Sequence, residues 1–209
     1  MSCNNGVAAA GLFGGDRQFD VAMHDYGPWT GQRSMNAEYW IPSEGTQKLE
    51  TAGANVVALP PYDYYAFLDD DLEISTESLN RLFEGGEAQK LELYQPALLP
   101  DSYGSWPHLF QQGYGLGIRS VPFVEVMCPF FSRAALMKCL WSFGLNQSGW
   151  GLDVCIWPKL VSDCHVIDAV TIGHRRPVGT ARQPMRNGLT ALQEFEIVKK
   201  INYDGQSPW

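Results

Sequence analysis

The sequence predicts a single α/β domain in which helices flank a mostly parallel central sheet. Short apolar runs, typical of buried strands, alternate with segments of helical periodicity. The chain has 209 residues, 45% of them hydrophobic, which suffices for one sizeable core. No internal repeat, low-complexity tract or linker divides it. We therefore expect residues 1–209 to form one domain.

Strands are expected where apolar runs end at turn-forming residues. One run leads into an acidic triplet, another precedes a Gly-rich turn, and a late one is rich in β-branched residues. The expected strands are residues 7–13, 19–23, 64–68, 91–95, 121–131 and 166–172.

Helices are expected after residues that cap a helix N-terminus. Ser75 or Thr76 caps a helix over residues 76–83, which the pair Gly85–Gly86 should end. Ser132 caps a second helix, and Thr190 opens a final one with Gln193 three residues later. Apolar residues on the second helix recur at helical spacing and predict its buried face: Leu136, Cys139, Leu140 and Phe143.

The overall charge argues against nucleic acid and anionic membranes as partners. Net charge is −8 and the sequence pI is about 4.9. No apolar stretch approaches the roughly 20 residues of a membrane span, and the first residues do not resemble a signal peptide. The five cysteines form no C-x-x-C pair, so we expect reduced thiols and a cytoplasmic location.

Asp69, Asp70 and Asp71 follow directly after the expected strand 64–68. Three carboxylates at the end of a buried strand need a neutralising partner, and a hard divalent cation such as Mg²⁺ or Mn²⁺ takes oxygen ligands. Asp69 and Asp71 form an Asp-x-Asp spacing that suits a metal bound to a substrate diphosphate. The alternative is an acidic turn leading into the next helix.

Two further segments carry candidate chemistry. Gly149-Trp150-Gly151-Leu152-Asp153 combines an aromatic ring for sugar stacking with a carboxylate that can accept a hydroxyl proton, although Asp153 also suits a helix N-terminus. The second segment is basic, and its Gly-containing flanks suit a lid that closes over a diphosphate. Its potential cations are His174, Arg175, Arg176, Arg182 and Arg186. The alternative is a solvated charged loop.

These motifs, in this order, resemble the GT-A glycosyltransferases, and most closely a GT-A-like family called domain of unknown function 707. The likeness covers residues 19–177. The similar segments are Phe67-Leu68-Asp69-Asp70-Asp71-Leu72, Gln95-Pro96-Ala97-Leu98, residues 124–135, Trp150-Gly151-Leu152-Asp153, and Val166-Ile167-Asp168-Ala169 with His174.

The resemblance implies a metal-dependent glycosyltransferase that moves a sugar from a nucleotide-diphosphate sugar to an acceptor hydroxyl, with inversion. Residues 1–75 would form the nucleotide and metal half, and residues 76–209 the acceptor half with a C-terminal basic lid. The implied ligands of Mn²⁺ or Mg²⁺ are Asp69, Asp71 and His174. The implied donor-binding residues are Asp69, Asp70, Asp25, Arg175, Arg176 and Trp150.

Asp153 is the implied general base. Glu125 is given an acceptor-binding role, with a structural ion pair as the alternative, because a lone acid in an apolar run needs a partner. An acceptor platform of aromatic side chains is also expected, with loop packing as its alternative: Tyr103, Trp106, Phe110 and Tyr114. Two other functions stay open, a metal-dependent nucleotide-sugar phosphohydrolase and a non-catalytic carbohydrate- or nucleotide-binding protein.

Overall fold

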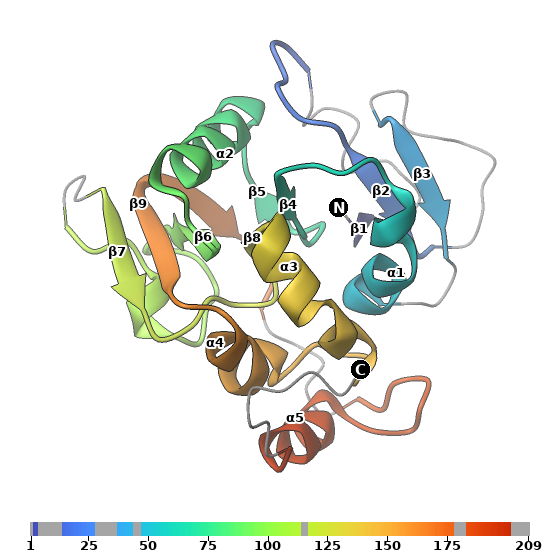
Figure 1. Ribbon diagram of the computed structural model, residues 1–209. Coiled ribbons are helices and arrows are strands. Elements are labelled where there is room, and N and C mark those ends of the chain that lie inside the picture. Colours follow the sequence, from blue (N-terminus) through green and yellow to red (C-terminus); the bar gives the residue numbers. More distant parts are fainter. Residues whose placement is uncertain are drawn as a thin grey trace.

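The computed structural model describes residues 2–3, 14–27, 37–43, 47–113, 117–177 and 183–201. These residues form two sheets and several helices, so the α/β class is confirmed (Figure 1). The expected strand 7–13 lies outside the described residues.

The smaller sheet has three parallel strands in the order β1 (Ser2–Cys3), β2 (Ala22–Asp25) and β3 (Tyr39–Pro42). The larger sheet has six strands. Five follow the order β4 (Tyr64–Ala66), β8 (Phe130–Ser132), β6 (Leu93–Leu98), β9 (Cys164–His174) and β5 (Leu72–Glu73), and β7 (Ile118–Val121) also pairs with β9.

The larger sheet is mixed, so the expectation of a mostly parallel central sheet is not confirmed. Within it only β6 and β9 pair in parallel. β8 inserts between β4 and β6 and runs antiparallel to both, while β5 and β7 pair antiparallel with β9. Alternating strands and helices predict parallel neighbouring strands only where a helix carries the chain back across the sheet. No helix separates β7 from β8, so the rule does not apply there.

The α-helices are α1 (Lys48–Asn55), α2 (Thr76–Gln89), α3 (Arg133–Cys139), α4 (Trp157–Leu160) and α5 (Ala191–Lys199). Short 3₁₀ turns cover Val56–Ala58, Pro107–Leu109 and Leu140–Gly144, and a π-helical turn covers Leu152–Ile156. The expected caps Ser75, Ser132 and Thr190 each accept a backbone N–H at the start of a helix. None of the helices in the described ranges is long and apolar enough to cross a membrane.

Helix α2 continues through Gly85 and Gly86, so the expected stop at these glycines is wrong. Gly86 lies inside the helix because the ring of Tyr94 packs against its backbone: an added Cβ would lie 2.0 Å from the Tyr94 hydroxyl oxygen. That hydroxyl donates a hydrogen bond to the Leu82 carbonyl (3.1 Å). The helix ends instead at Lys90, whose φ of 53° is left-handed.

The expected strand 121–131 is also wrong over most of its length. Only its two ends belong to strands, as the last residue of β7 and the first residues of β8. The intervening residues form a loop and a turn, and prolines at 122 and 129 lack the N–H that a strand ladder requires. Glu125 therefore lies on a loop.

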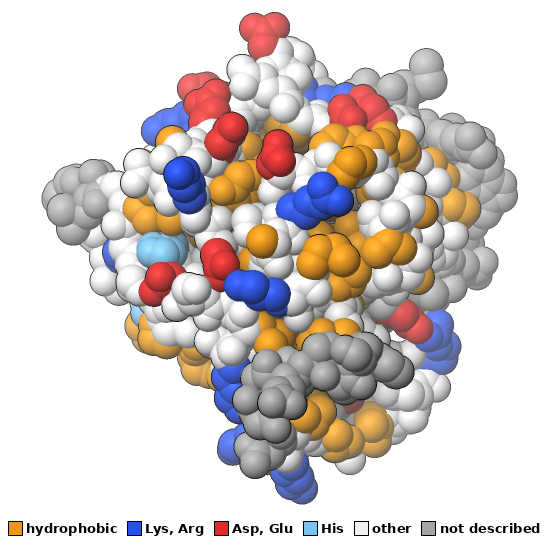
Figure 2. Space-filling model, in the orientation of Figure 1, with side chains coloured by type: hydrophobic (Ala, Val, Ile, Leu, Met, Phe, Trp, Pro, Cys, Tyr) orange, Lys and Arg blue, Asp and Glu red, His pale blue; other side chains and the backbone are white. Residues whose placement is uncertain are grey.

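The core lies between the larger sheet and the helices that cover it. Aromatic side chains from three segments pack edge to face at its centre: the Phe131 ring lies 5.1 Å from that of Trp157 and 5.9 Å from that of Phe67. The Trp157 indole N–H donates to the Ser142 hydroxyl (3.0 Å), which satisfies a fully buried donor. On the face shown in Figure 2, acidic and basic side chains are interspersed over the described part of the surface.

Candidate functional site

A cavity of about 690 Å³ brings together residues that are far apart in the sequence. It lies where the strand-end acids, the 125–127 loop, the 148–154 turn and α5 meet. Six of the predicted site residues line it: Asp69, Asp71, Glu125, Trp150, Asp153 and His174. The geometry thus gathers both the expected metal-binding and the expected acceptor-side residues around one space.

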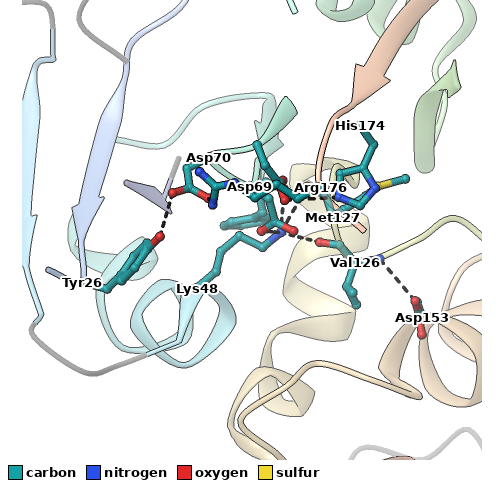
Figure 3. Close-up of polar contacts among 11 residues, drawn as sticks. Tyr26, Lys48, Asp69, Asp70, Val126, Met127, Asp153, His174 and Arg176 are labelled. Atoms are coloured by element: carbon teal, nitrogen blue, oxygen red, sulfur yellow. Dashed lines mark hydrogen bonds and ion pairs between the residues drawn. The ribbon is translucent and has the colours of Figure 1, made fainter. Parts of the chain in front are cut away.

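The carboxylate of Asp69 pairs with a lysine that the sequence reasoning missed. Lys48 Nζ lies 2.7 Å from Asp69 Oδ1, and it also donates to the main-chain carbonyls of Phe67 (3.3 Å), Met127 (3.2 Å) and Val126. Burial raises the pKa of Asp69, and the charge of Lys48 opposes that rise. Asp69 already has a cationic partner within the protein (Figure 3).

Asp70 faces a different set of partners. Its Oδ2 accepts a hydrogen bond from the Tyr26 hydroxyl (2.7 Å), and its Oδ1 lies 3.5 Å from Arg176 Nη1. Burial, followed by the hydrogen bond to Asp70, raises the pKa of Tyr26 well above its usual range, so Tyr26 acts as a hydrogen-bond donor. Asp70 thus connects the end of β2 to the basic segment (Figure 3).

Asp71 pairs with His174, the residue that the resemblance assigns to the same metal. His174 Nε2 lies 3.3 Å from Asp71 Oδ2, and His174 Nδ1 lies 2.6 Å from the Tyr103 carbonyl, to which it must donate. The hydrogen bond to Asp71 raises the pKa of His174. Burial opposes ionisation of Asp71, but the hydrogen bond from His174 outweighs it and lowers the pKa of Asp71. Each of the two groups therefore favours the charged form of the other.

The donor set at Asp71 suits a divalent cation that substrate oxygens also bind. Asp71 Oδ1 is buried and has no hydrogen-bond partner among the described residues. A histidine whose second ring nitrogen donates to a carbonyl is also the usual form of a metal-binding imidazole. Within the described ranges, no group of three or more His, Cys, Asp or Glu side chains is placed to hold a metal by itself. Mg²⁺ commonly binds through one or two protein ligands together with phosphate and water, so the two residues fit that mode.

Glu125 and Asp153 are two further acids that line the cavity. Burial, with a contribution from the Asp153 charge, raises the pKa of Glu125 to about 7. Glu125 Oε2 is buried and has no partner among the described residues. Asp153 accepts the N–H groups of Val126 (3.2 Å) and Val154 (2.9 Å), yet burial still raises its pKa to about 6. Both carboxyls therefore titrate close to neutral pH.

A side chain of α5 holds the turn that carries Trp150. Glu194, buried on that helix, accepts the N–H groups of Gln147 (3.0 Å) and Ser148 (2.8 Å). Gly151 has a φ of +89°, and an added Cβ would lie 3.1–3.2 Å from side chains of α5, so only glycine fits without strain. This packing fixes the turn at one wall of the cavity.

The basic segment is more fully paired with acids than the sequence suggested. Arg175 contacts Glu73 (2.6 Å) and Asp101 (2.9 Å) at the surface, and Arg186 contacts Glu50. Arg182 lies outside the described residues. Of the expected donor-binding arginines, Arg176 brings its side chain to the acidic triplet, whereas Arg175 contacts it only through its backbone N–H, which donates to the Asp71 carbonyl (3.1 Å).

The long loop after β6 is anchored by an ion pair. Asp168, fully buried, accepts from Arg119 Nε (2.7 Å), and Arg119 also donates to the carbonyls of His108 and Phe110. Among the expected platform residues, Trp106 lines the cavity, Phe110 packs against the core and Tyr103 is 49% exposed. Tyr114 lies outside the described residues.

Asp25 does not line this cavity. It is buried at the end of β2, where its Oδ1 accepts the N–H of Gly27 (3.1 Å). The contact is typical of a carboxylate that stabilises a turn.

Comparisons with known protein families and curated proteins identify no relative of this chain, so its function is inferred from its motifs and geometry. No protein-family model matches the sequence. No curated protein matches it either.

Sequence reasoning missed Lys48, Tyr26 and Glu194. A signal for the helix that carries Lys48 was present, because Gln47 and Glu50 form a capping box at the start of α1. Apart from Asn187, which lies seven residues from Glu194, the partners of these side chains lie 19 to 79 residues away in the sequence, and no local pattern identifies them.

Proposed function

We propose that this chain is a metal-dependent glycosyltransferase with a GT-A-like fold, which transfers a sugar from a nucleotide-diphosphate sugar to an acceptor hydroxyl with inversion. The observation that carries the proposal is the single cavity that Asp71 and His174 line together with Glu125, Asp153 and Trp150. This arrangement offers a place for a diphosphate beside a place for a sugar hydroxyl.

Asp71 and His174 would hold Mn²⁺ or Mg²⁺, with the donor diphosphate and water as its other ligands. When bound, the ion would neutralise charge that develops on the leaving diphosphate. Asp70 and Arg176 form an ion pair at the edge of the triplet, and their polar groups suit the ribose or the donor sugar. The Trp150 ring offers an apolar face for a sugar ring.

Asp153 is the proposed general base. It is ionised above a pKa of about 6, and its two backbone hydrogen bonds leave acceptor capacity on both oxygens. It would take the proton of the acceptor hydroxyl as that oxygen attacks the sugar carbon from the face opposite the leaving diphosphate. Glu125, with an unpartnered oxygen, would accept a hydrogen bond from the same acceptor.

The first experiment is a thermal-shift screen of nucleotide sugars with and without Mn²⁺. A ligand at about 100 times its Kd stabilises the native state by about 2.7 kcal/mol, which gives a measurable rise in Tm. Asp71→Asn should abolish the Mn²⁺-dependent part of the rise. Asp163→Asn is the matched control, because it removes an exposed carboxylate outside the cavity.

Product analysis with the ligand found in the screen then identifies the reaction. Transfer to an added sugar acceptor, reduced about 10²–10⁴-fold by Asp153→Asn with donor affinity retained, supports the proposal. Release of sugar or nucleotide to water at a rate that no acceptor changes would identify a phosphohydrolase. Absence of any Mn²⁺-dependent nucleotide-sugar binding would refute the proposed function.

A further inference from the structure

Lys48 is enclosed by acceptors rather than by solvent. It is the first residue of α1, and its side chain is 13% exposed. Its ammonium faces one carboxylate oxygen, on Asp69, and three main-chain carbonyl oxygens. An ammonium has three N–H donors, so these four acceptors satisfy it fully. A lysine is buried in this way only where its charge is balanced.

The carbonyls around Lys48 belong to the segments that form the cavity. Met127 O also accepts the Asp69 N–H (3.0 Å), which extends the pairing of the β4 segment with the 125–129 loop. Val126 gives its carbonyl to Lys48 and its N–H to Asp153 (3.2 Å). One ammonium therefore connects the strand-end acids to the loop that carries Glu125 and contacts Asp153 (Figure 3).

We propose that Lys48 is a positioning residue of this site, which supplies the counter-charge of Asp69 and holds the 125–127 loop against the acidic triplet. The inference rests on the proposed function and deepens it. Because Asp69 is balanced from within the protein, a divalent ion binds through Asp71 and His174. Asp69 then acts as a fixed acceptor and does not ligate the metal.

Calorimetric titration with Mn²⁺ alone separates the charge of Lys48 from a structural role. Lys48→Met removes the positive charge beside Asp69, so the affinity for Mn²⁺ should rise about tenfold or more. Asp69→Asn leaves the positive charge of Lys48 without its partner and should lower the affinity by a similar factor, whereas the double variant removes both charges and should return to near the wild-type value. Lys138→Met is the matched control, because Lys138 pairs with Glu92 at the surface (2.9 Å).

Amide hydrogen exchange of residues 125–129 tests whether the contacts of Lys48 with the main-chain carbonyls hold this loop in place. Asp69→Asn keeps the carbonyl contacts of Lys48, so its exchange should match the wild type. The double variant Lys48→Met/Asp69→Asn removes the carbonyl contacts of Lys48 without leaving a buried unpaired carboxylate. Its amide exchange should be faster than that of Asp69→Asn. This pair of proteins decides the question even if Lys48→Met alone does not fold.

The outcomes distinguish this inference from the proposed function. Loss of Mn²⁺ binding in the double variant Lys48→Met/Asp69→Asn, equal to that in Asp71→Asn, would make Asp69 a metal ligand and overturn the inference. Equal Mn²⁺ affinity in Lys48→Met and Lys138→Met would overturn it as well, as would equal exchange in Asp69→Asn and the double variant. A wild-type protein that does not bind Mn²⁺ refutes the proposed metal site, whereas Mn²⁺ binding gained by Lys48→Met would still support the role of Lys48.

Discussion

Replacing Glu125 with glutamine should stabilise the protein at pH 8 and not at pH 4.5. Burial and the nearby Asp153 raise the pKa of Glu125 from its ordinary value of 4.5 to about 7. The folded state therefore keeps a proton that the unfolded chain releases between these two pH values. Since the native state binds more protons there, the free energy of unfolding falls as pH rises through this range.

The size of the effect follows from the same two values. At about 1.4 kcal/mol per pH unit, ionising Glu125 in the folded protein costs up to about 3 kcal/mol above pH 7. Glutamine does not pay this cost, but its amide group places new donors beside the buried Oε2 position, at roughly 1 kcal/mol at every pH. Glu125→Gln should thus be about 1 kcal/mol less stable than the wild type at pH 4.5 and about 2 kcal/mol more stable at pH 8.

Urea denaturation of both proteins from pH 4.5 to 8, with a chelator present, measures this difference. The pH dependence of the difference reports the ionisation of Glu125 together with its coupling to Asp153, as long as the m-values agree. A stability difference that stays constant over the whole pH range would show that Glu125 ionises normally, and the argument from its burial would then be wrong.

Two further changes test the packing and the loop anchor. Gly86→Ala should destabilise α2 by about 1–3 kcal/mol in thermal melts, despite the better helix propensity of alanine, because the new Cβ meets the Tyr94 hydroxyl at 2.0 Å. Gly85→Ala, whose Cβ meets only the end of a flexible side chain at 3.3 Å, is the control and should be nearly neutral. Asp168→Asn should cost about 3 kcal/mol in urea melts, because Arg119 loses its buried counter-charge. Equal stability of the two glycine variants, or an unaffected Asp168→Asn protein, would contradict these assignments.

Local patterns predicted the elements that carry their own signals. The acidic triplet follows β4 as expected, and the capping box at Thr190 opens α5. The meeting of Asp71 with His174 was also predicted, through the order of motifs along the chain. Whether these residues have the chemical roles assigned to them stays a prediction.

Two of the failures arise where a residue's role depends on distant partners. Arg175 looks like a free cation in the sequence, but its acids lie 102 and 74 positions away. Gly86 looks like a helix stop in the sequence. Its real role is to make room for the Tyr94 ring, which belongs to the next strand and gives no local signal. The expected strand around Glu125 failed for a local reason instead: the apolar run contains two prolines, which lack the N–H that a strand ladder requires. Local patterns register composition and spacing, whereas the contacts of Arg175 and Gly86 are tertiary.

The contact of Glu194 with the 147–148 backbone has a consequence for how the chain can be shortened. The turn bearing Trp150 takes its shape from a carboxylate more than 40 positions later, on the last described helix. A protein that stops before residue 190 would keep Asp71, His174 and the sheet. It would nevertheless lose the Glu194 carboxylate that holds residues 147–148, so the cavity wall at Trp150 would become more mobile while the acidic triplet stayed in place. Helix α5 is thus a structural part of the pocket.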